Sequence, residues 1–233
     1  YATADLGEVS VIGADTSLAV NASGAATASK MTVSTGTLTV AGAKSSATIG
    51  ALNLNKSGTV SVGNSGAVVV TGDTVFAKDS TGDFTVNGTG AKVSLQNVTF
   101  AKDATGTNKV NVQSGSVTID GTLTANSGSL TIAGATAAAT VNGKVVAAGS
   151  TKTGLVELTQ GTLTLGSTAD IGTETGAVKL TAGKLEAASA LLLANQDSTV
   201  TDEAAKKKLL NKALGLSTQN TSLLITVTDE KLS

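Results

Sequence analysis

Three aspartates are the residues best suited to chemistry in this sequence. Asp79 and Asp103 end two copies of the segment Phe-Ala-Lys-Asp, and Asp83 closely follows the first copy. Paired carboxylates can act as acid and base in polysaccharide cleavage. The chain contains no His, however, and all 16 of its basic residues are Lys, so no imidazole or guanidinium is present to assist these acids. We therefore expect no enzyme activity and assign no catalytic residue.

Metal and cofactor sites also lack the residue types they need. Without Cys or His the chain has neither the usual zinc ligands nor a thiolate nucleophile. The acidic nonapeptide repeat and the EF-hand loop, which gather several oxygens around calcium, are missing as well. The sequence predicts no metal site and no cofactor.

The charge balance argues against two classes of partner. The 17 acidic residues nearly cancel the lysines and leave a net charge of −1, whereas nucleic-acid binders carry a basic patch. Asp202 and Glu203 precede the triplet Lys206 to Lys208, so we interpret the triplet as a solvated helix face. No apolar run approaches the ~20 residues of a membrane-spanning helix. We expect neither nucleic-acid binding nor membrane insertion.

Threonine pairs separated by one residue form a further pattern. A flat stack of such pairs is what an ice-binding repeat protein presents, but these pairs do not recur at every repeat. Thr is also common on the solvent side of strands. We therefore favour an ordinary solvent-facing role for Thr37 and Thr39, Thr122 and Thr124, and Thr162 and Thr164.

The elements that carry these residues are short strands with apolar residues at alternate positions. Gly36 to Val40, Gly58 to Val62, Gly115 to Ile119 and Gly161 to Leu165 share this plan. Alternation with period 2 predicts that Val, Leu and Ile point inward and that Thr and Ser point outward.

A longer repeat lies above the short one. Phe76 to Asp79 returns 24 residues later as Phe100 to Asp103, and weaker echoes recur at 22 and 24 residues. The pattern predicts an all-β fold, a right-handed parallel β-helix (solenoid) with about three short strands per 22–25-residue coil. The Lys-Asp pairs 78–79 and 102–103 should then stack at one corner and help to fix the register.

An antiparallel β-sandwich or barrel is the alternative, because it also contains many short alternating strands. The long repeat favours the solenoid, as does the rarity of hairpin turn signals. Asn87-Gly88, Asp120-Gly121 and Asn142-Gly143 are exceptions that fit real hairpins.

The pattern fades at both ends, which divides the chain into three regions. Residues 1–30 form an incomplete coil or cap in which Ala22 to Ala28 is a loop or part of a coil, and residues 31–201 form the β-helix. Residues 202–233 form a C-terminal cap: a helix over 202–215, with Leu209, Leu210 and Leu214 facing the last coil, and a strand from Ser222 to Val227. A start at Tyr1 rather than Met predicts a processed or excised chain.

The strand units, the Ser/Thr/Asn/Gly-rich turns and the absence of Cys over residues 30–200 resemble right-handed parallel β-helix passengers of autotransporter and filamentous-haemagglutinin-like bacterial adhesins. The resemblance implies a secreted protein at the bacterial cell surface, whose rigid stalk presents loops to a glycan or protein of a host or a neighbouring cell.

We therefore expect a non-enzymatic extracellular surface or adhesin module. The alternative is a structural subunit of a surface layer, filament or phage particle that associates with copies of itself.

Overall fold

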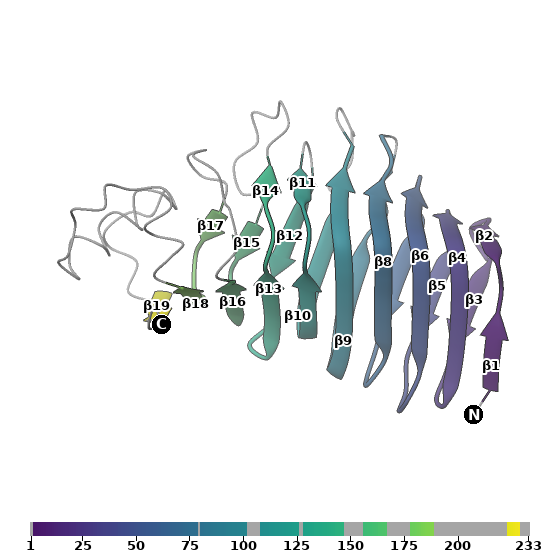
Figure 1. Cartoon of the computed structure of the whole chain (residues 1–233), viewed down its shortest axis with the longest axis horizontal. Coiled ribbons are helices and arrows are strands. Elements are labelled where there is room, and N and C mark those ends of the chain that lie inside the picture. Colours follow the sequence, from purple (N-terminus) through teal and green to yellow (C-terminus); the bar gives the residue numbers. More distant parts are fainter. Residues whose placement is uncertain are drawn as a thin grey trace, which may run out of the picture.

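The computed structural model describes residues 2–78, 80–101, 108–125, 128–146, 156–166, 178–188 and 223–228. These residues form nineteen strands in one continuous parallel sheet that winds as a β-solenoid of about seven turns. Figure 1 shows the strands side by side along the longest axis, with β1 near the N-terminus at one end and β19 at the other. Among the described residues there is no helix long and apolar enough to cross a bilayer.

Each turn of the chain contributes to three faces, and several strands bend from one face onto the next. Face 1 contains β1 (Ala2–Asp5), the first parts of β4 (Gly24–Ser34), β6 (Ser46–Asn55) and β8 (Ala67–Phe76), the middle of β9 (Phe84–Phe100), the end of β10 (Lys109–Ile119), β13 (Ala137–Val141), β16 (Thr162–Leu165), β18 (Gly183–Ala188) and β19 (Leu223–Thr228).

The other two faces follow along the same coils. Face 2 contains β2 (Glu8–Ile12), the second parts of β4, β6 and β8, the end of β9, β11 (Leu123–Ala125) and β14 (Val145–Val146). Face 3 contains β3 (Ser17–Val20), β5 (Thr37–Val40), β7 (Thr59–Val62), the starts of β9 and β10, β12 (Ser129–Ile132), β15 (Val156–Leu158) and β17 (Val178–Leu180).

The predicted alternation of buried and exposed residues is confirmed except in β12, where Ser129 and Thr131 are buried together with Leu130 and Ile132. In β5, β7 and β16 every second residue is buried and the residues between are partly exposed. Buried side chains stack on their register partners in successive coils, as Leu38 does on Val60 and Val60 on Phe84. This stacking joins the apolar edges of short strands into one core, which no single coil could form by itself.

The predicted repeat is confirmed at the two phenylalanines. Phe76 and Phe100 are register partners in adjacent coils, and their rings stack with centroids 4.6 Å apart. The coil length varies more than predicted, up to the 40 residues that separate the register partners Gly183 and Leu223. Ser17 already pairs with Thr37, whereas Lys109 follows Asp83 by 26 residues.

The antiparallel alternative is wrong, because every strand pair among the described residues is parallel. The three suspected hairpin turns are therefore also wrong. Asn87-Gly88 lies inside β9, and the other two dipeptides connect faces 1 and 2. Glycine is required at these corners by close stacking: a Cβ on Gly143 would lie 1.8 Å from the carbonyl oxygen of Gly121 in the coil below.

At the ends of the chain the predictions have mixed outcomes. Most of the segment Ala22 to Ala28 belongs to β4, which continues past residue 30. The predicted strand near the C-terminus is confirmed as β19, which pairs with β18. The predicted helix over 202–215 and its three leucines lie outside the described residues. The division into 1–30, 31–201 and 202–233 stays a prediction.

One buried position interrupts the apolar core. Thr74 is fully buried between Leu52 and Val98 in adjacent coils of face 2, and its hydroxyl has no hydrogen-bond partner. A buried hydroxyl without a partner lowers stability, because it loses its hydrogen bonds to water on folding.

We expect Thr74→Val to raise the free energy of unfolding by about 1 kcal/mol, since valine has nearly the same shape and no polar atom. Urea denaturation measures this, with Thr118→Val on the half-exposed outer side as the control expected to change little. A loss of stability in Thr74→Val would contradict the assignment of an unpaired hydroxyl.

Inward and outward positions of one strand should respond differently to a charge. Val117→Asp is expected to cost about 4 kcal/mol or more, because the carboxylate would enter the core, whereas Thr118→Asp should cost less than about 1 kcal/mol. Thermal and chemical denaturation would check both variants. Equal losses in the two variants would contradict the observed burial. Leu163→Asp should behave like Val117→Asp.

Candidate functional site

From β1 to β16, one corner of the solenoid carries most of the variation in the length of the segments between strands. We call it the loop corner, and it comprises the segments between the end of each face-2 strand and the start of the next face-3 strand. In early coils these segments are short, as at residues 35–36 and 56–58. The segments at residues 77–83, 101–108 and 147–155 are longer, whereas the segment at residues 126–128 is again short. In Figure 1 the strands that precede the longer segments, β8, β9 and β14, all point to the same edge of the molecule.

The corner between faces 3 and 1 is held to a narrower range of conformations. Ser23, Lys44 and Ser65 precede successive face-1 strands, and all have positive φ values near 60°. Gly90 takes the same conformation in the next coil. A left-handed residue repeated at one corner keeps each turn tight, and Thr35 and Lys56 also have positive φ values in the short early segments of the loop corner.

The first long segment is attached to the coil below it by its polar residues. The Ser80 side chain is fully buried and its hydroxyl donates to the carbonyl oxygen of Lys56 at 3.1 Å. The backbone N–H of Gly82 donates to the same carbonyl oxygen at 3.0 Å. Lys78 and Thr81 are exposed. The segment therefore has a fixed base and presents Lys78 and Thr81 to solvent.

Of the three candidate aspartates, only Asp83 lies among the described residues. It closes the segment 77–83, and its carboxylate accepts a hydrogen bond from the backbone N–H of Lys109 at 2.9 Å. Burial raises the pKa of Asp83, and the hydrogen bond and positive charge of Lys109 partly oppose this shift. Asp79, Lys102 and Asp103 lie outside the described residues, so the stacked Lys-Asp pairs stay a prediction.

The next long segment ends at Asn108, which sequence reasoning did not single out. Asn108 is fully buried, and neither its side-chain oxygen nor its nitrogen has a hydrogen-bond partner. Its backbone oxygen accepts from Ser129. By register it occupies the position that Gly82 and Gly128 occupy in the coils before and after it. An Asn in a polar loop gives no sequence signal of burial, because only the stacking of coils covers it.

Polar side chains outside the loop corner mainly connect coils. Asn97 donates to Asp73 at 3.0 Å, and Asn142 donates to Asp120 at 2.8 Å, both between adjacent coils. The threonine pairs lie on the outer side, as predicted. The Thr37 hydroxyl contacts the Thr59 hydroxyl at 3.0 Å. These contacts fix the register and occupy the oxygens concerned.

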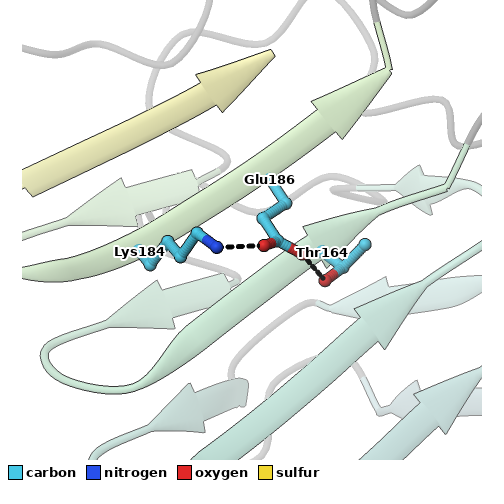
Figure 2. A network of polar contacts seen from close by, with 3 residues as sticks. All are labelled: Thr164, Lys184 and Glu186. Atoms are coloured by element: carbon cyan, nitrogen blue, oxygen red, sulfur yellow. Dashed lines mark hydrogen bonds and ion pairs between the residues drawn. The ribbon is translucent and has the colours of Figure 1, made fainter. Parts of the chain in front are cut away.

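Near the end of the described stack, three residues form a charged network on face 1. Figure 2 shows Lys184 and Thr164 contacting the two carboxylate oxygens of Glu186. The Thr164 hydroxyl donates at 3.2 Å from the coil below. The hydrogen bond and charge of Lys184, with help from Thr164, lower the pKa of Glu186 despite some burial. Thr164→Asp would place a second carboxylate beside Glu186, so we expect it to cost more than Thr118→Asp.

The described residues contain no group of three or more acidic side chains that could hold a metal ion. No known family model matches the chain, and neither a curated protein nor a solved structure matches it.

The raised pKa of Asp83 leads to a prediction about pH. The folded protein binds this proton more tightly than the unfolded chain does, so this contribution to stability is present at low pH and is lost as pH rises through the folded-state pKa. Asp83→Asn, which keeps an acceptor for Lys109 and removes the charge, should raise the melting temperature at pH 7. The gain should shrink towards pH 3.

Melting curves across this pH range check the prediction, with Asp15→Asn at an exposed turn as the control. A variant that is less stable than the parent at pH 7 would show that the Asp83 charge is stabilising.

Proposed function

We propose that this chain is a non-enzymatic module of an extracellular surface protein, a bacterial adhesin, in which the β-solenoid is a stiff stalk and the loop corner binds the partner. The observation that carries the proposal is that, from β1 to β16, the segments longer than five residues between strands all lie at one corner of the stack. Loops on a rigid scaffold are the usual carriers of binding.

The regular part of the structure supports the role of a stalk. Parallel ladders connect every coil to the next, and a continuous column of buried residues runs through the described stack, as from Ala47 through Val68, Val93 and Val117 to Ala139. Bending such a stack would open hydrogen bonds and expose apolar surface together, so it resists bending. This construction suits a part that holds binding loops away from a cell surface.

The chemistry of the loop corner favours an uncharged or weakly charged partner. Its described exposed groups are hydroxyl and amine groups and the carboxylate of Asp15, with Lys78 and Thr81 on the first long segment. Such groups form hydrogen bonds with the hydroxyls of a glycan or with the backbone of a protein. The resemblance of the strand units to adhesin passengers adds the expectation that this partner belongs to a host or a neighbouring cell.

Binding can be tested on arrays of glycans and host-matrix proteins with the whole 233-residue chain. We expect at least one ligand class to bind. Exchange of residues 77–83 for the short corner segment 56–58 should lower the affinity for that ligand about tenfold or more, because the loss of one buried contact group can account for this factor. Lys78→Glu and Thr81→Lys test the same segment without shortening it.

The matched control is Thr118→Lys on face 1, which should bind as the parent does. The proposal fails if no ligand binds, or if the loop-corner variants and Thr118→Lys bind equally well.

A further inference from the structure

Three dipeptides in which glycine follows Asn or Asp share one kind of reactivity. They are Asn87-Gly88, Asp120-Gly121 and Asn142-Gly143, and the first and third lie in the same local sequence, Val-Asn-Gly. The backbone nitrogen of glycine can attack the side-chain carbonyl carbon of the residue before it, because glycine has no Cβ to obstruct the approach. This reaction is one reason why asparagine is a labile residue. It needs a glycine N–H without a hydrogen bond and a backbone that can turn toward the side chain.

The fold holds Asn87-Gly88 in an unreactive arrangement. Both residues lie inside β9, where Asn87 is the register partner of Ser114 and accepts a hydrogen bond from its hydroxyl at 3.3 Å. A Cβ on Gly88 would lie 2.2 Å from the backbone nitrogen of Asn64, so the glycine is closely stacked on the coil below. Closing a ring between Asn87 and Gly88 would therefore have to break the ladder.

The two corner dipeptides differ in the state of the glycine nitrogen. The N–H of Gly121 donates to the carbonyl oxygen of Gln96 at 2.6 Å, which occupies the attacking group. Asn142-Gly143 lies one coil further on, between β13 and β14. The N–H of Gly143 donates to no backbone oxygen in the part of the chain that the structure describes. Of the three dipeptides, only Asn142-Gly143 combines a place outside the strands with an unoccupied glycine nitrogen.

We propose that Asn142 is a site of spontaneous deamidation, which replaces its contact with Asp120 by a pair of like charges and weakens the stack at this corner. The Gly143 nitrogen gives its proton to water and bonds to Cγ of Asn142. The bond between Cγ and the side-chain nitrogen breaks, and this nitrogen takes a proton from water and leaves as ammonia. A water molecule then opens the succinimide ring, which leaves aspartate or isoaspartate at position 142. The site is independent of the binding role of the loop corner.

The product fits its surroundings less well than asparagine does. The side-chain nitrogen of Asn142 donates to the Asp120 carboxylate at 2.8 Å, whereas a carboxylate has no hydrogen to donate and repels its neighbour. Isoaspartate also adds one carbon to the backbone, at a corner where Gly143 is closely stacked on Gly121. The next strand, β14, has only two residues. Few other backbone hydrogen bonds therefore hold this part of the coil.

Peptide mapping by mass spectrometry, on the whole chain aged at neutral pH, tests the site. In the folded protein we expect Asn142 to deamidate about tenfold faster than Asn87 or more, since one intact hydrogen bond can account for this factor. In the chain unfolded in guanidinium chloride the two Val-Asn-Gly sequences should react at similar rates, because only the fold distinguishes them. Equal rates in the folded protein would overturn the proposal. So would an Asn142 that stays intact while the unfolded chain reacts.

Asn97 provides a matched control in the same experiment. Its side chain donates to Asp73 at 3.0 Å, in the same kind of contact that Asn142 makes with Asp120. Val98 follows it in place of glycine, so we expect Asn97 to stay intact. Deamidation of Asn97 as fast as that of Asn142 would show that the glycine nitrogen is not what selects the site.

Asn142→Asp tests the consequence of the reaction separately. It should lower the melting temperature at neutral pH, and Asp120→Asn in the same chain should restore most of the loss, because the amide and the carboxylate then exchange places. A melting temperature that Asn142→Asp leaves unchanged, or a loss that Asp120→Asn does not reduce, would overturn the proposed weakening. Neither experiment depends on a ligand, so a failure to bind glycans or matrix proteins would leave these results unchanged.

Discussion

The parallel pairing of each coil with the next is the interaction on which the rest of this structure depends. Individual strands are as short as the two residues of β14 and the three of β11, and none could exist by itself in water. Stacking satisfies the backbone of each coil and buries its Val, Leu and Ile residues at the same time. Hydrogen bonding and apolar burial therefore cannot be separated in this fold, and a coil without a neighbour loses both.

This constraint explains where the chain tolerates irregularity. A side chain at a tight corner meets the backbone of the coil below, as a Cβ on Gly66 would meet the carbonyl oxygen of Val40 at 2.3 Å. A core side chain meets its register partner, as Phe100 meets Phe76. From β1 to β16, the longest segments between strands occur where the chain leaves face 2. Binding loops and the rigid stack thus occupy different parts of the same coil.

The proposed binding role follows from the way in which the sides of a solenoid meet solvent. These sides are closed by hydrogen bonds within the stack and differ from one another mainly in side chains and loops, which suits recognition of a partner. A stiff stalk and binding loops are therefore compatible in one molecule.

The sequence by itself determined the period, the inward and outward residues and the contact between Phe76 and Phe100, because each of these follows from a local alternation repeated at a fixed distance. It did not decide what the Asn-Gly and Asp-Gly dipeptides do: a hairpin and a tight corner require similar residues, and only the coil beneath Gly143 distinguishes them. Nor did it reveal the burial of Thr74 and Asn108 or the partner of Asp83. Those features depend on which residues of neighbouring coils lie above and below, and that is a property of the stack rather than of any segment.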